Sequence, residues 1–582
     1  MIFPLPKHSQ EVLQRASLAT VCLCLRFWRL KLSQVWSNLH ISYRGGQYSV
    51  ERLLALDEYT RTASLFRVLF TITALFLPLE VFIICQESVP LQDPVLGWRG
   101  NYGFWIRATI VSGAVFYTIM VQAKYFLKSF IISRSQQLLL ISCGTAVQMV
   151  ATMAVAAYVW FPIPFMPLTM IPVLYGVSIA ASFLITGVSV IRAVLADRER
   201  LVCFGGFIAT QQITTLIYPA YQVLFHAVNN TNYELLVIFL LPVIKLVIKN
   251  LALRFVVHME DMMPEAVIFT VDFYNAVYMA TSMENTNSTL SVFIIVLVDI
   301  ARSATMLYCF YRRTATTMAR LSEAAKVMGI VGNVLGGASR LCKHEGSFKM
   351  QSRQRIQIRS CLSHNISLEL RGLLDQLERL SRIESSRKYS AYVNRVEVSE
   401  LTIFAKAGLV DKPATWVDRY NLNVIFPAPT YDSRSKTDSK RQSRSQFDSK
   451  SATPHVNILR EALEVLFTTE CLILSTVIDA FVPLCYGIYL LVLVHLQSAK
   501  YHTELAGATT ATIGDVVGPI FVFSLVESIA LVLLVALIYR NLGFSALHHL
   551  AFVLETQREL FQSKLVACST MVLALRVVHF GT

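Results

Sequence analysis

Five charged side chains stand near the centres of long apolar stretches, where an ionised group is costly. They are Lys245, Asp272, Asp299, Arg302 and Glu527. Inside a membrane-spanning helix, such residues pair with one another or mark the path of an ion or polar solute. The function that they indicate is therefore the passage of an ion or a small polar solute, with these five residues as the candidate site.

The spacing of these residues decides which of them can pair locally. Asp299 and Arg302 are three residues apart, so they share one helix face and can neutralise each other. Lys245 has no such partner on its own helix and needs a carboxylate from elsewhere, for which Asp272 and Glu527 lie at the right depth. Two interpretations stay open, a locked structural ion pair and a part of an ion pathway.

Two further features of the apolar stretches are weaker signals. Asp479 also falls within one of them. Pro78 precedes Glu80, and Pro242 precedes Lys245, in similar local sequences five stretches apart, as in the inverted repeats of some transporters. Proline is common in membrane helices, so coincidence is the preferred interpretation.

The composition requires membrane-spanning helices to position these residues. The 582-residue chain is 54% hydrophobic and 15% charged, and its mean hydropathy is +0.52. A soluble domain carries about 25% charged residues, so an ordinary soluble enzyme, a disordered chain and a secreted disulfide scaffold are excluded. We expect an all-α fold, a polytopic transmembrane helix bundle. About ten segments approach the roughly 20 apolar residues that a span needs: 63–85, 103–123, 137–161, 168–191, 201–227, 235–253, 265–283, 289–311, 471–496 and 516–539.

The spans divide the chain into five regions. These are an N-terminal segment with amphipathic helices (1–62), an eight-span bundle (63–311), a basic insert (312–458), two further spans (459–540) and an amphipathic, interfacial C-terminal helix (541–582). The apolar run 565–580 is short and contains Arg576, so we expect it at the interface rather than across the membrane.

Loop charge predicts the orientation. With the N-terminus inside, the outer loops carry only Arg99 and Lys500 as basic residues, whereas the short inner loops carry seven. The glycosylation acceptors Asn229 and Asn287 both fall in predicted outer loops. We therefore expect an integral protein of the plasma membrane or an endomembrane with both termini in the cytoplasm.

The insert at 312–458 concentrates positive charge next to the inner membrane face. It holds 25 Lys and Arg against 13 Asp and Glu. Docking on anionic inner-leaflet lipids is one interpretation, and a solvated loop that only enforces topology is the other. Its residues 430–452 are polar and of low complexity, so we expect disorder there, with Ser443 as a candidate phosphorylation site in a basic context.

One apolar stripe inside the insert predicts a helix. Ile366, Leu370, Leu373, Leu377 and Leu380 repeat at alternating steps of four and three residues. Two heptads are too few for a stable coiled coil. We expect the stripe to pack on its own domain or on the membrane, with a dimer contact as the alternative.

No sequence motif supports an enzyme. A P-loop, a His-Glu-x-x-His motif, a Gly-x-Ser-x-Gly motif and a kinase signature are all absent from the sequence. Eleven cysteines occur without Cys-x-x-Cys or zinc-type spacing. We expect no metal and no cofactor, no nucleic acid as partner, and the lipid bilayer as the surroundings.

Two stretches carry a family resemblance. The sequence QYSVERLLALDEYTRT at 47–62 leads into the first span, and CQESVPLQDP at 85–94 is followed by NYGFWIR at 101–107. They resemble a large group of multi-spanning membrane proteins of oomycetes. The resemblance covers about the first fifth of the chain, and it implies a multi-pass membrane protein without an assigned activity.

Two functions from different classes follow from these observations. The first is a transporter or channel for a small polar solute or ion that uses the five intramembrane charges. The second is a non-transporting receptor or scaffold that acts through the basic insert. The central charges that lack a partner on their own helix favour transport.

Overall fold

The computed structural model is built from helices. It describes residues 46–580, apart from 229–230, 232, 257–258, 285–288, 329–332, 345, 347, 349–355, 381–456 and 506–508. All regular elements in these ranges are α-helices or short 3-10 helices. The prediction of an all-α bundle is confirmed.

Eight helices among the described residues are long and apolar enough to cross a membrane. They are α3 (Leu65–Glu87), α5 (Tyr102–Phe126), α6 (Arg134–Tyr158), α10 (Arg198–Val228), α11 (Glu234–Val256), α13 (Thr289–Met328), α17 (Ile458–Leu493) and α18 (Ile513–Leu542). Their outward faces carry large apolar side chains such as Phe66 and Val532, which are 80% and 66% exposed. Such surfaces suit hydrocarbon rather than water, and the chain is an integral membrane protein.

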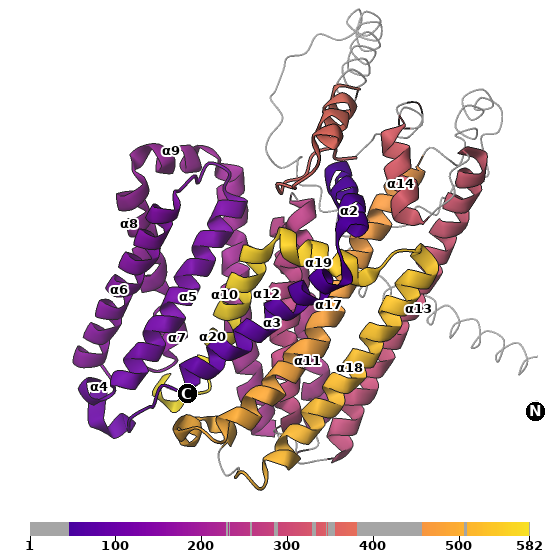
Figure 1. Cartoon of the computed structure of the whole chain (residues 1–582). Helices are drawn as coiled ribbons and strands as arrows, with labels where there is room; N and C mark the ends of the chain where they lie inside the picture. Colours follow the sequence, from indigo (N-terminus) through magenta and orange to yellow (C-terminus); the bar gives the residue numbers. More distant parts are fainter. Residues whose placement is uncertain are drawn as a thin grey trace, which may run out of the picture.

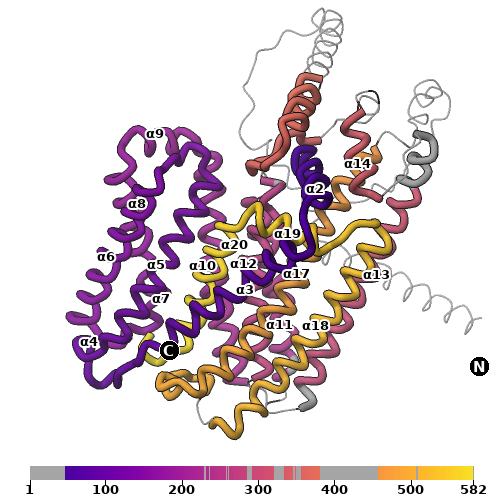
Figure 2. Tube along the Cα trace, viewed as in Figure 1, coloured from indigo at the N-terminus to yellow at the C-terminus, as the bar shows by residue number. Residues whose placement is uncertain are grey.

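These helices form two packed groups (Figures 1 and 2). In the first, α6 packs between α5 and α8 (Ile171–Thr186). In the second, α17 lies against α18, and α13 packs on α18. The long α3 and α20 (Arg558–Ala574) lie between the groups: α20 packs on α5 and α12, and α3 packs on α20 and α17.

The fourth expected span is broken. The sequence predicts one helix over 168–191, but α8 ends at Thr186 and α9 (Val188–Ala196) leaves it at an angle of 119°. Gly187 makes the corner with φ of 84° and ψ of 162°, a conformation that is essentially restricted to glycine. The described helices therefore give eight spans, or nine with this bent pair, instead of about ten.

The central helix of the bundle is α12 (Met263–Glu284), the weakest of the expected spans. Almost all of its side chains are buried, Glu265 and Asp272 completely. It contacts α10, α11, α17, α18 and α20. Because protein surrounds α12, its polar side chains meet other polar groups rather than lipid.

The C-terminal segment differs from the expected interfacial helix. The helix α20 runs through the bundle, packs on α3, α5 and α12, and buries most of its side chains. Lys564 of α20 pairs with Glu265 of α12 at 2.8 Å. Arg576, which suggested an interfacial position, is also buried and pairs with Glu504. Partners from distant segments thus compensate the charges that argued against burial.

The last described residues lie at the end of the bundle that holds the predicted outer loops. The Thr503 amide donates to the Arg576 carbonyl, and His579 Nε2 lies 2.5 Å from the Gln92 carbonyl oxygen. The helix α2 (Val50–Thr62) lies at the opposite end, as Figure 2 shows. The first and the last described residues therefore lie at opposite ends of the bundle.

A layer of shorter helices covers the end of the bundle near α2. It comprises α2, α14 (Val334–Lys343), α19 (Ala546–Thr556) and a helical segment at 368–380.

Serine side chains cap the N-termini of two helices in different parts of the molecule. Ser49 caps α2, and Ser133 forms a capping box with Gln136 at α6. The remaining short elements are η1 (Pro94–Leu96), α4 (Gly97–Gly100), α7 (Met166–Thr169), η2 (Glu260–Met262), η5 (Gln497–Tyr501), η6 (Thr503–Leu505) and η7 (Val578–Phe580).

Parts of the expected insert belong to this packed layer. The helix α13 continues to Met328, and α14 packs on α2 and α17. The predicted apolar stripe at 366–380 packs against the rest of the protein. Leu377 and the neighbouring Leu374 are fully buried in the main core. Residues 430–452 and Ser443 lie outside the described residues.

Candidate functional site

The five predicted intramembrane charges come together in one place. They join Lys249 and Asp479 in a cluster that we call the charge network, which consists of Lys245 and Lys249 from α11, Asp272 from α12, Asp299 and Arg302 from α13, Asp479 from α17 and Glu527 from α18. All seven residues lie well inside their helices, so five helices contribute charge to the interior of the bundle.

Lys245 forms one half of the network. Its Nζ lies 3.2 Å from Asp272 Oδ1 and 3.7 Å from Asp479 Oδ1. Ser475 Oγ donates a hydrogen bond of 2.7 Å to the other oxygen of Asp272. Lys249, one turn along α11, adds a second positive charge that acts on Asp272. The sequence-based choice of Asp272 as a partner of Lys245 matches this geometry.

Arg302 forms the other half. Its Nε donates to Asp299 Oδ1 at 2.8 Å, as the three-residue spacing suggested. Its guanidinium also reaches Asp479 Oδ2 at 3.2 Å and Glu527 Oε1 at 3.3 Å, on two other helices. Asp479 therefore bridges the halves, with one oxygen toward Lys245 and the other toward Arg302.

Burial is uneven across the network. The carboxylates of Asp272, Asp299, Asp479 and Glu527 are at most 5% exposed. The side chain of Arg302 is 27% exposed because α13 lies at the edge of the bundle. The network is thus a buried acidic centre with a cation at its more accessible edge.

The acidic members outnumber the basic ones. The seven residues hold four carboxyl groups and three cationic groups. Arg302 contacts both Asp299 and Glu527. Two carboxyl groups that share one cation repel each other when both are ionised, and a proton on one of them removes that repulsion. A single proton on this pair would bring the charge of the seven groups to zero.

Sequence reasoning underestimated Asp479 and omitted Lys249 from the site. Both stand in apolar stretches, and Lys249 follows Lys245 by one helical turn, so a count of all intramembrane charges would have found them. The bridging role of Asp479 depends on how α17 packs between α12 and α18, which no local pattern encodes.

A second buried polar cluster lies in the layer near α2. Arg52 pairs with Glu470 of α17 at 2.7 Å, and both side chains are fully buried. Tyr48 donates to Glu470 and lies 2.6 Å from His549 Nε2 of α19. This cluster ties α2, α17 and α19 together.

Residues 360–364 of the insert join this cluster through Asp261. Ser360 Oγ donates to Asp261 Oδ2 at 2.7 Å, and the Ser49 amide donates to Asp261 Oδ1 at 3.2 Å. His364 lies 3.1 Å from Ser360 Oγ. Burial, together with the positive charge of Arg52, lowers the pKa of His364 to about 4. His364 is thus neutral at pH 7 in the contact between residues 356–364 and Asp261.

Burial makes two cysteine thiols outside the spans unreactive. Burial raises the pKa of the Cys342 and Cys361 thiols to about 12, so neither is a nucleophile at neutral pH. Among the described residues, no group of three or more His, Cys, Asp and Glu side chains could hold a metal ion. Asn229 and Asn287 lie outside the described residues.

Comparison of the chain with protein-family models, curated proteins and solved structures gave no match.

Proposed function

We propose that this protein transports a small polar solute or an ion across the membrane and couples that movement to protons at the charge network. The observation that carries the proposal is the convergence of seven charged residues from five helices in the bundle interior. Charge is expensive at this depth and is found there mostly where a site requires it.

A proton is the coupling ion that the chemistry of the network favours. Asp299 and Glu527 both contact Arg302, and one proton on this pair would remove the excess negative charge of the network. Loss of that proton would leave the network with a net negative charge in a medium of low dielectric constant, a state that favours the arrival of a cation or a rearrangement of the ion pairs.

Asp479 is the residue through which such a change would spread. It shares its two oxygens between Lys245 and Arg302, so a new charge on Glu527 would compete with Asp479 for Arg302. Pro242 and Pro483 lie inside α11 and α17, close in sequence to Lys245 and Asp479. Each proline removes one helix hydrogen bond and allows its helix to bend there.

Proton flux in vesicles tests the proposal. Purified protein is placed in liposomes that contain a pH-sensitive dye, and amino acids, sugars, organic acids and monovalent cations are added in turn. We expect at least one solute to drive a proton flux that falls at least tenfold in Glu527→Gln and Lys245→Met. The control Glu199→Gln, at an exposed position, should keep the flux. A flux that is equal in Glu527→Gln and in the unchanged protein would contradict the proposal.

A receptor or scaffold is the second candidate, favoured by the docking of residues 356–380 on α2. The amides of Val50 and Glu51 donate to the carbonyls of Gln357 and Ile358. For this function, anionic inner-leaflet lipids or a cytoplasmic protein would be the partner of the basic insert. Deletion of 385–455 leaves the docked segment in place and should remove a partner without a change in any flux.

A further inference from the structure

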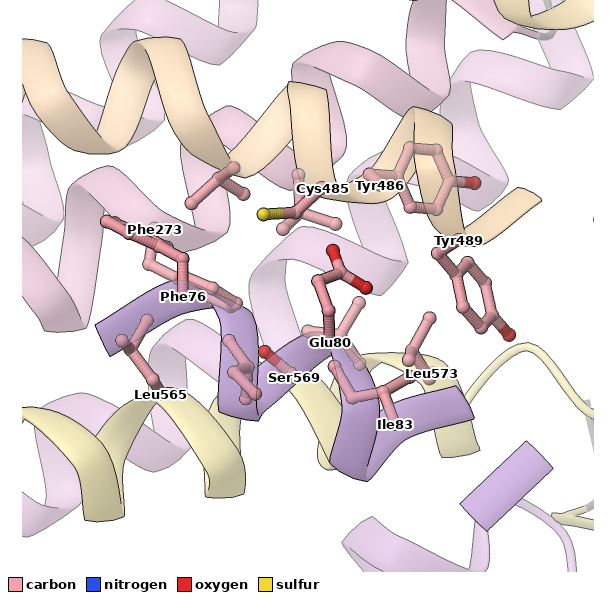
Figure 3. A pocket seen from close by; sticks show the side chains of 14 residues that line it. Phe76, Glu80, Ile83, Phe273, Cys485, Tyr486, Tyr489, Leu565, Ser569 and Leu573 are labelled. Carbon is pink, nitrogen blue, oxygen red and sulfur yellow. The ribbon is translucent and has the colours of Figure 1, made fainter. Parts of the chain in front are cut away.

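An apolar cavity lies between α3, α12, α17 and α20 and contains one carboxylate (Figure 3). Its walls include Phe76, Phe273, Val482 and Leu573, all of them buried. Its volume is about 50 Å³, several times the roughly 10–15 Å³ that one water molecule needs. The figure shows the Glu80 side chain directed into this space.

Glu80 has no cationic partner among the described residues. Its Oε2 is buried without a hydrogen-bond partner there, and the Cys485 side chain lies beside it in the cavity wall. Glu87, at the end of the same helix, has Arg107 as a partner, whereas the half-buried Glu80 has no such partner among the described residues. An isolated carboxylate in apolar surroundings is costly unless a cation or a proton joins it.

The shape and the charge of the cavity define a ligand class. A cation that fits needs an ammonium group for Glu80 and a short apolar body for the aromatic and aliphatic walls. The cavity volume limits the ligand to about three to five non-hydrogen atoms, given the space that each water-sized unit takes. Pro78, two residues before Glu80, interrupts the hydrogen bonds of α3, so α3 is the wall that can move to admit the ligand.

We propose that Glu80 and the surrounding cavity bind a short-chain primary alkylammonium ion. The proposal does not depend on transport by the charge network, because the cavity and its carboxylate belong to a different set of side chains. The proposal predicts that the site binds a charged amine more tightly than a neutral alcohol of the same size.

Calorimetric titration of the full-length protein in detergent with butylammonium and 1-butanol tests the site. We expect saturable binding of butylammonium with at least tenfold higher affinity than 1-butanol. Glu80→Gln should reduce the butylammonium affinity at least tenfold and leave the 1-butanol affinity unchanged. Glu80→Asp, which keeps the charge, should retain binding, as should the control Glu199→Gln.

Two results would overturn the proposal. One is equal affinity of the unchanged protein for butylammonium and 1-butanol, a comparison that needs no variant to fold. The other is equal butylammonium affinity in Glu80→Gln and the unchanged protein, which would mean that Glu80 is neutralised by a proton and that water fills the cavity. Both results leave the flux experiment on the charge network unaffected.

Discussion

At the scale of single residues, the buried charges differ in what surrounds them. Asp479 contacts two of the three cations of the network, Lys245 and Arg302, whereas Arg52 and Glu470 pair with each other. A closed pair of this kind is usually structural, because removal of one partner leaves an uncompensated charge. A shared carboxylate has two alternative partners, and this property suits a site that changes its charge during a transport cycle.

Replacement of Lys245 tests how strongly the network holds the bundle. Lys245→Met leaves the fully buried Asp272 without its nearest cation, so we expect a loss of about 3 kcal/mol in stability. Asp272→Asn in the same chain should recover part of it. Thermal melting in detergent measures the effect, and Lys500→Met, in an exposed position, is the control. A melting temperature of Lys245→Met equal to that of the control would count against a tightly coupled network.

His364 makes stability depend on pH. Its pKa is about 4 in the folded protein, below the ordinary value of 6.5, so the unfolded state binds the proton more readily. The contribution is complete above about pH 6.5 and is lost as the pH falls toward 4, and it amounts to about 3 kcal/mol. The groups that face His364 are Arg52, Asp261 and Glu470.

Melting curves between pH 7.5 and pH 4 isolate the effect of His364. The buried His549 and the carboxylates titrate in the unchanged protein and in His364→Gln alike, so the difference between the two pH profiles belongs to His364. We expect a shallower loss of stability in His364→Gln. Parallel profiles would show that the segment around His364 stays docked when the histidine is protonated.

At the scale of elements, hydropathy located most of the helices and failed where partners lie far apart in sequence. The stretch 63–85 and the helix α3 (Leu65–Glu87) nearly coincide because lipid faces much of that helix. Hydropathy gave α12 only weak support and placed α20 at the interface. Glu265 of α12 and Lys564 of α20 compensate each other, and no local pattern contains that pair.

The corner between α8 and α9 gives a test at this scale. Gly187→Ala should cost about 1–3 kcal/mol, because alanine rarely adopts φ of 84° with ψ of 162°. No side chain lies close enough to clash with the added carbon, so the effect belongs to the backbone. Gly176→Ala, inside α8 and also in open space, should be neutral or stabilising. Equal melting temperatures of the two variants would mean that α8 and α9 form one continuous helix.

At the scale of the whole molecule, the two described ends of the chain lie at opposite ends of the bundle. Loop charge alone predicted a cytoplasmic C-terminus, since α20 was not counted as a crossing segment. In the fold, α20 carries the chain from the layer near α2 to the loops that contain Gln92 and Thr503. The route follows from burial, which the sequence pattern of 565–580 did not reveal.

Labelling of intact cells with a membrane-impermeant maleimide tests this route. We expect a cysteine at Val95, which is 91% exposed in a predicted outer loop, to react from the outside. Val578→Cys should react from the same side, and Arg61→Cys in α2 should react only after the cells are made permeable. Labelling of Val578→Cys together with Arg61→Cys would instead place both ends of the chain on the cytoplasmic side.

The central claim is that the charge network holds one proton between Asp299 and Glu527, and infrared spectroscopy of the purified protein at pH 7 tests it most directly. We predict the carbonyl stretching band of a protonated carboxyl group that is missing in Glu527→Gln and retained in Glu199→Gln. Identical spectra of the unchanged protein and Glu527→Gln in this region would mean that Glu527 holds no share of a proton, and would contradict the account.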